Sequence, residues 1–145
     1  MKQQLTILKV GGKIVETPAL LQQLLTDFAQ IEGRKILVHG GGRTATDMAT
    51  RLGIETHMVD GRRITDADML RVVTMVYGGL VNKTLIAQLQ SRGVNAIGLT
   101  GADMNVIRSH RRPLKNGIDY GFVGDVDKVD AERLALLLDA GITPV

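Results

Sequence analysis

Twice near its amino terminus, the chain passes from a short apolar run into glycines and then into a segment with helical periodicity. The first run is residues 5–10, which ends at Gly11 and Gly12, and the second is residues 35–39, which ends at the glycine triplet 40–42. Repeated strand, glycine turn and helix are typical of βαβ units. We therefore predict an α/β fold, a three-layer αβα sandwich around an open, mainly parallel sheet.

The same pattern continues to the end of the chain. Apolar positions at intervals of three and four predict helices, and short apolar runs between turn residues predict buried strands. The expected helices are residues 18–31, 40–52, 66–77, 80–92 and 131–140, and the later strands are residues 94–99 and 142–145. No linker or low-complexity segment divides the 145 residues, so we expect one unit.

Two dipeptides predict tight turns. Asp60 and Gly61 favour the left-handed backbone of a type I′ turn, so a protruding hairpin is expected within residues 54–64. Asn116 and Gly117 predict a second turn, flanked by two short strands.

Helix boundaries are indicated by capping residues. Thr17, which precedes Pro18, is expected to be an N-cap, and Thr65 is expected to form a capping box with Asp68. The glycines at 78–79 are expected to break or kink the third helix.

Composition excludes several classes of function. The chain has no cysteine, which excludes disulfides and thiolate metal sites, and His57 and His110 lack the spacing of metal ligands. The net charge of +3 is small, and the basic stretch 108–115 lacks interleaved aromatics, so we expect no nucleic-acid partner. Residues 5–10 are too short for a signal peptide or a membrane span, so we expect a cytoplasmic location and no membrane partner.

The glycines that follow the first two strands are candidate anion-binding residues. Because neighbouring parallel strands end at the same sheet edge, both glycine turns are expected to face one pocket. Glycine lets the backbone approach a phosphate or carboxylate closely, and a following helix adds unpaired N–H groups. The alternative is that these glycines only permit sharp turns. The residues concerned are Gly11, Gly12, Gly40, Gly41 and Gly42.

Two basic side chains accompany these turns. Lys9 lies in an apolar strand just before Gly11, where an anion would compensate its ammonium; the alternative is a lysine that extends from an edge strand into solvent. Arg63, after the hairpin turn, can pair with a carboxylate at two points, whereas Arg62 would point to the opposite, solvated face. His39 is expected to bond loop backbone rather than transfer protons.

The glycine turns have features of two common nucleotide-binding motifs. Residues 12–14 read Gly-Lys-Ile and lack the upstream glycine of a P-loop, which excludes that motif. Residues 40–45, with Asp60 further on, satisfy the dinucleotide fingerprint, although Asp60 lies in the expected hairpin. A dinucleotide-binding module therefore stays as a second hypothesis.

Six segments, in order along the chain, resemble the amino-acid kinase family. They are residues 9–12, 38–42, 60–65, 79–83, 98–103 and 121–124. The resemblance implies transfer of the γ-phosphoryl group of ATP, carried with Mg²⁺, to the side-chain carboxylate of an N-acylated L-glutamate, which gives an acyl phosphate. A carboxylate is already ionised at pH 7, so the reaction needs no general base.

The resemblance also assigns roles to individual residues. Lys9 would stabilise the transferring phosphoryl group as the catalytic residue, and the hairpin would act as a lid. The phosphate-binding residues would be Gly11, Gly12 and Gly41. The acceptor-binding residues would be Gly41, Gly42 and Arg63, with Arg63 on the α-carboxylate. No residue is expected to bind a metal directly, because the magnesium would be held mainly by nucleotide phosphates.

Members of the family are longer than this chain and hold the nucleotide mainly in their second half. By resemblance, residues 1–145 are the amino-terminal, acyl-amino-acid-binding lobe of a longer protein that forms a homodimer. A third hypothesis is a catalytically silent fragment that still binds acyl glutamate. The sequence leaves open whether the acyl group is acetyl or a longer one such as succinyl.

Overall fold

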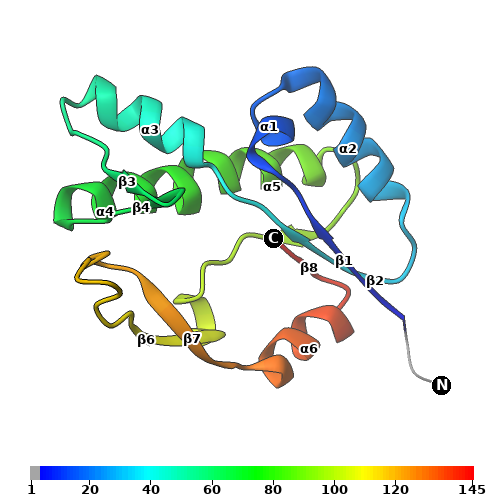
Figure 1. Ribbon diagram of the computed structural model, residues 1–145. Helices are drawn as coiled ribbons and strands as arrows, with labels where there is room; N and C mark the ends of the chain where they lie inside the picture. The colour runs from blue at the N-terminus through cyan, green and yellow to red at the C-terminus, as the bar shows by residue number, and fades with distance from the viewer. Residues whose placement is uncertain (1–3) are drawn as a thin grey trace.

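The computed structural model describes residues 4–145, with parallel strands in the middle of the molecule (Figure 1). β1 (Leu5–Lys9) pairs in parallel with β2 (Arg34–Val38), and β5 (Ala96–Ile97) pairs in parallel with β8 (Thr143–Pro144). β2 and β8 lie side by side, so these strands form one layer. The predicted α/β fold with a parallel sheet is confirmed, although β5 is shorter than the predicted strand.

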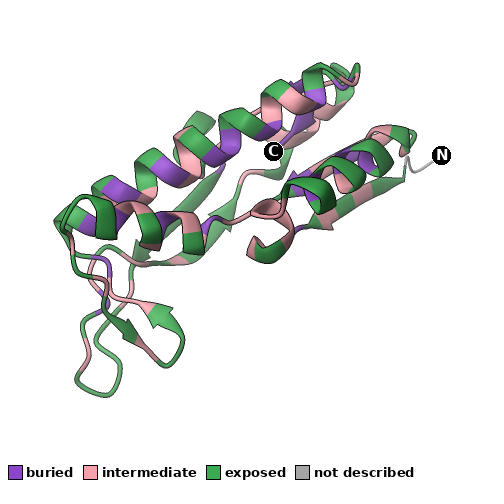
Figure 2. Cartoon of the chain, turned by 90° about the horizontal axis from the view of Figure 1, so that it is seen from above, coloured by how far each residue is buried: buried purple, intermediate pink, exposed green. Residues whose placement is uncertain are grey.

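The main core lies between this layer and the helices on one of its faces. These helices are α1 (Gly12–Val15), α2 (Pro18–Gln30), α3 (Gly42–Arg51) and a long helix over residues 67–90. The inner sides of α2, α3 and the long helix are buried, as the purple segments of α2 and the long helix show in Figure 2. The core side chains that are at most 1% exposed include Leu25, Phe28, Leu37, Val72, Leu85 and Leu89. Burial of such side chains is the main force that holds the helices on the strands.

The long helix continues through Gly78 and Gly79, where the sequence predicted a break or a kink. It consists of α4 (Ala67–Val73), a π-helical segment (Thr74–Val81) and α5 (Asn82–Gln90). Gly78 lies inside the π segment, and a Cβ atom there would lie 3.2 Å from Cγ2 of Thr100. The glycine thus permits close packing against a neighbouring loop instead of ending the helix.

By length and composition alone, the helix over residues 67–90 could cross a membrane. Many of its apolar side chains, however, face the core along one side, although Met75 and Leu80 are 54% and 52% exposed. Met69, Val72, Val76 and Leu85 are each at most 1% exposed. This pattern is that of a core helix in a globular domain.

The predicted hairpin is confirmed. It consists of β3 (Met58–Val59) and β4 (Arg62–Arg63), which pair in an antiparallel arrangement. Asp60 and Gly61 between them have φ values of 49° and 73°, as a type I′ turn requires.

The predicted N-cap position of Thr17 before Pro18 is confirmed, whereas the predicted Thr65 cap is wrong. Thr17 occupies the N-cap position of α2, but its hydroxyl donates to the carbonyl of Lys13 at 2.7 Å. α4 is capped by Asp66, whose carboxylate accepts a hydrogen bond from the N–H of Met69 at 2.8 Å. Thr65 is instead buried in a backbone bridge to Gly121, a long-range contact that local sequence does not encode.

The opposite face of the sheet carries a second hairpin and a helix (Figure 1). β6 (Ile107–Arg111) and β7 (Gly124–Val129) are antiparallel, and α6 (Ala131–Asp139) follows them as predicted. The predicted Asn116-Gly117 turn is confirmed by φ values of 51° and 76°. Its expected flanking strands are reduced to a single bridge between Lys115 and Ile118.

The first strand is less buried than the sequence predicted. Leu5 and Ile7, on the face of β1 that is turned away from α2, are 42% and 60% exposed. The predicted fully buried strand is therefore wrong for this face, where Ile7 lines a cavity beside β6 and α6 instead of packing in the main core.

Candidate functional site

The two glycine turns leave the sheet at the same edge. In the β1–β2 register Lys9 is opposite Val38, and the N–H of Val10 donates to the carbonyl of Val38 at 2.8 Å. Residues 11–12 and 40–42 follow directly, so the structure brings the two turns close together, as predicted for parallel neighbours.

Glu16, which sequence reasoning missed, joins the two turns. Its Oε1 accepts a hydrogen bond from the N–H of Thr44 in the first turn of α3 at 3.1 Å, and a Cβ atom on Gly12 would lie 3.9 Å from the same oxygen. Its Oε2 is buried without a hydrogen bond and lies 3.8 Å from Nε of Arg43. The Glu16 carboxylate therefore accepts one of the N–H groups at the N-terminus of α3, the positive end of the helix dipole.

The backbone around Gly41 retains free donors. Among residues 4–145, the N–H groups of Gly42 and Arg43 in the first turn of α3 have no acceptor. A Cβ atom on Gly41 would lie 3.1 Å from Cδ1 of Tyr77 and 3.2 Å from Cγ2 of Val81. Gly41 therefore lets the turn pack tightly on the long helix while its neighbours offer N–H groups to an anion.

Lys9 is exposed at the end of β1, and within the described chain its ammonium has no hydrogen bond or ion pair. Among these residues β1 pairs only with β2, so it is an edge strand. The expected burial of the strand around Lys9 is therefore wrong, and the structure has the alternative, a lysine on an edge strand. The exposed position at the same edge as both glycine turns nevertheless leaves the ammonium available to a ligand there.

Arg63 is held against α3. Its Nη2 donates to the carbonyl of Gly42 and to Oγ1 of Thr46, both at 2.9 Å, and its Nη1 lies 3.7 Å from Sδ of Met69. An arginine has five N–H donors, so some remain available to a ligand. The hairpin that carries Arg63 is thus positioned beside the second glycine turn.

Arg63 lines a cavity of about 320 Å³ between the β3–β4 hairpin, the long helix and the loop that joins β6 to β7. Thr65, which lies between β4 and α4, and Tyr77 of the long helix contribute polar groups, and Arg112 and Tyr120 do so from the loop. Tyr77 is therefore shared between this cavity and the Gly41 turn.

The loop that lines one side of the cavity is fixed by a glycine contact. Gly121 has a φ of 73°, and a Cβ atom there would lie 2.2 Å from the carbonyl oxygen of Thr65. The N–H of Phe122 donates to that oxygen at 2.7 Å, and the N–H of Thr65 donates to the carbonyl of Tyr120 at 2.9 Å. Only glycine permits so close an approach of the two backbones.

An ion pair fixes the same loop on its other side. Arg112 donates from Nε and Nη2 to Oδ1 of Asp125 at 3.0 and 2.7 Å. These hydrogen bonds lower the pKa of the Asp125 carboxyl and raise the pKa of Arg112. The β6 side chains at residues 107–111 are exposed, but Arg112 lines the cavity, and nothing in the sequence distinguished it from its basic neighbours.

His39 bonds loop backbone, as predicted. Its Nδ1 donates to the carbonyl of Gly40 at 2.9 Å, and its Nε2 accepts from Nδ2 of Asn82 at 3.0 Å, so the ring is the neutral Nδ1–H tautomer. Asn82 is 2% exposed, and it also donates to the carbonyl of Val145 at 3.0 Å and accepts from Nζ of Lys83 at 2.9 Å. This network ties the second glycine turn to the end of β8.

The dinucleotide hypothesis requires an acidic residue at the end of the second strand of the unit. Asp60 instead lies in the turn of the β3–β4 hairpin. Within residues 4–145, no group of three or more histidine and acidic side chains is arranged to hold a metal ion.

Comparisons with known proteins agree with this architecture. Residues 4–145 match the model of the amino acid kinase family. Proteins named acetylglutamate kinase from Bacteroides thetaiotaomicron and Phocaeicola vulgatus are 68% and 69% identical over all 145 residues, and the chain spans 56% of the length of each. The structure of N-acetylglutamate synthase from Neisseria gonorrhoeae, in complex with coenzyme A and N-acetyl-glutamate, superposes with a TM-score of 0.77 at 24% identity; the match covers 97% of this chain and 33% of that one.

The family match covers nearly the whole chain, and the likeness to the synthase independently supports the fold. The protein therefore belongs to the amino acid kinase family.

Proposed function

We propose that this chain is the acceptor-binding part of an enzyme that phosphorylates the side-chain carboxylate of an N-acyl-L-glutamate with ATP. The relatives named acetylglutamate kinase, up to 69% identical, support this acceptor class. The observation that carries the proposal is the position of Arg63, which joins the first turn of α3 at Gly42 and lines the adjoining cavity. A guanidinium beside unpaired helix N–H groups suits a substrate that presents two anionic groups.

In this proposal the α-carboxylate of the acceptor pairs with the free N–H groups of Arg63. The side-chain carboxylate lies near Gly41 and Gly42, where the open donors of α3 orient it. One of its oxygens bonds to the γ-phosphorus of ATP as the bond to the β,γ-bridging oxygen breaks, and ADP leaves. Because the attacking carboxylate is already charged, the work of the site is alignment and charge compensation.

Lys9 supplies that compensation in the proposal. Its exposed ammonium at the end of β1 has no partner within the described chain and stands at the edge where Gly11 and Gly12 begin the next turn. An ammonium there stabilises negative charge on the phosphoryl oxygens during transfer. Magnesium would arrive on the nucleotide phosphates. Cytoplasmic location and a homodimer stay predictions from the sequence.

The acceptor role of Arg63 is tested by Arg63→Ala and Arg63→Lys in a full-length protein that carries this chain. Steady-state assays with N-acetyl-L-glutamate and ATP should show a KM for the acceptor raised on the order of tenfold or more in Arg63→Ala, because a charge-assisted pair is lost. Lysine should restore little, since it lacks the planar fork. An unchanged KM in both variants would exclude Arg63 from acceptor binding.

Lys9→Ala tests the catalytic role. We expect kcat to fall on the order of a hundredfold or more with an unchanged far-ultraviolet circular dichroism spectrum, because an exposed side chain contributes little to folding. Lys128→Ala, which removes an exposed lysine from β7, is the matched control. Equal activity of the two variants would remove Lys9 from the mechanism. Titration of the 145-residue chain with N-acetyl-L-glutamate separately tests the silent-fragment hypothesis.

A further inference from the structure

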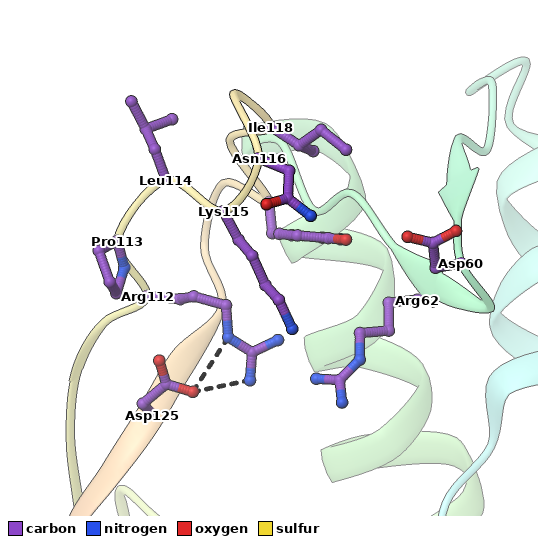
Figure 3. Close-up of a pocket in the computed structure, with 10 residues that line it drawn as sticks. Asp60, Arg62, Arg112, Pro113, Leu114, Lys115, Asn116, Ile118 and Asp125 are labelled. Carbon is purple, nitrogen blue, oxygen red and sulfur yellow. Dashed lines mark hydrogen bonds and ion pairs between the residues drawn. The ribbon is translucent and has the colours of Figure 1, made fainter.

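A second cavity adjoins the one beside Arg63. It has a volume of about 400 Å³ and lies between the β3–β4 hairpin and the β6–β7 loop (Figure 3). Arg62, Arg112 and Tyr120 line both cavities, so the two share a wall. A ligand bound in one cavity can therefore extend into the other.

Positive side chains converge in this second cavity. Figure 3 shows Arg62, Arg112 and Lys115 directed toward a common space from two different elements. The Arg112 side chain is paired with Asp125, whereas the Arg62 guanidinium and the Lys115 ammonium have no hydrogen bond or ion pair with any residue from 4 to 145. Asp60 is the one other acidic side chain in the lining, so the cavity carries an excess of positive charge.

The cluster is held in place by the backbone rather than assembled from free side chains. The contact of Gly121 with Thr65 fixes the loop to the start of α4, and Arg112 is fixed to Asp125 through two hydrogen bonds. Arg62 is adjacent to Arg63, which is itself bonded to α3. Cations held near one another in this way repel, and an anion between them removes that repulsion.

We propose that this cavity is a carboxylate subsite, bound by Arg62 and Lys115, beside the acceptor cavity. This proposal rests on the proposed function, because it assumes that the adjoining cavity beside Arg63 binds the acceptor. The carboxylate has two possible sources. It is either the terminal group of a dicarboxylic acyl chain on the acceptor, which passes Arg112 and Tyr120 from one cavity to the other, or a separate small dicarboxylate.

The test compares acceptors in a full-length protein that carries this chain. N-succinyl-L-glutamate has a terminal carboxylate on its acyl group, and N-butanoyl-L-glutamate has a chain of similar length without one. Lys115→Met should raise the ratio of the KM for the succinyl acceptor to that for the butanoyl acceptor by about five- to tenfold, because only the former loses an ion pair. Arg62→Met should act in the same direction. Lys128→Met, on β7 outside the cavity, should leave the ratio unchanged.

Calorimetric titration with succinate tests the second source without turnover. Succinate that binds the unmodified protein and binds Lys115→Met about fivefold or more weakly, with no change in the ratio of acceptor KM values, would assign the subsite to a free dicarboxylate. An unchanged ratio together with no succinate binding that depends on Lys115 would overturn the proposal. Absence of turnover with every acceptor would refute the kinase function instead, and the titration would still decide the subsite.

Discussion

Gly98→Ala should disrupt the buried network around Asn82. A Cβ atom at position 98 would lie 1.8 Å from Oδ1 of Asn82 and 2.9 Å from its Cγ. Asn82 must therefore withdraw by about an ångström or more, and as a 2% exposed side chain it has little room to do so. Withdrawal breaks its hydrogen bonds to Nε2 of His39 and to the carbonyl of Val145, both 3.0 Å long.

The cost can be estimated from these contacts. Two hydrogen bonds contribute about 1 kcal/mol each, and buried polar groups left unpaired cost about 1–3 kcal/mol, so the free energy of unfolding should fall by roughly 3–5 kcal/mol. For a chain of this length that corresponds to a Tm lowered by about 10–15 °C.

The assay is thermal unfolding followed by circular dichroism. Gly79→Ala is the matched control, because a Cβ atom there meets nothing within 4 Å and the position is helical. We expect that variant to keep or slightly raise the Tm. If Gly98→Ala unfolds at the same temperature as Gly79→Ala, Asn82 does not hold the end of β2 to β8 in the way described.

Three further perturbations test other parts of the fold. Lys35→Met should lower the free energy of unfolding by about 2–4 kcal/mol in urea titrations, because buried Lys35 donates from Nζ to three carbonyls at the end of α2, at 2.7–3.0 Å; a change below about 0.5 kcal/mol would contradict that role. Glu16→Ala should cost about 1 kcal/mol by the same measurement and Glu16→Gln less, since only the glutamine can still accept from the N–H of Thr44; equal losses would refute the cap. Hydrogen bonds to Thr100, Gly121 and Arg112 lower the pKa values of Asp103, Asp119 and Asp125, respectively. Their contribution to stability is therefore present above the unfolded pKa near 3.8 and lost as the pH falls below it, so Asp125→Asn should make the loss of stability between pH 5 and 2 less steep. An identical pH profile would refute the assignment.

The local parts of this fold could be predicted from the sequence because short-range physical chemistry decides them. Apolar periodicity located α2 and α6, and the backbone preference of Asp60-Gly61 placed the hairpin that carries Arg63. Glycine turns after two parallel strands predicted a common edge, since the sheet geometry leaves no other arrangement.

Contacts between distant segments required the tertiary structure. Thr65 was expected to cap a helix, but its backbone pairs with the loop at Tyr120 and Phe122, some 55 residues away along the chain. Sequence reasoning missed Glu16 and gave Asn82 no role, because each acts through partners that only folding brings within reach. In the sequence Arg112 is one basic residue among several. Only the packing of the two hairpins places it between two cavities. Local sequence therefore determined the elements and the edge of the sheet, and long-range packing decided which side chains share a site.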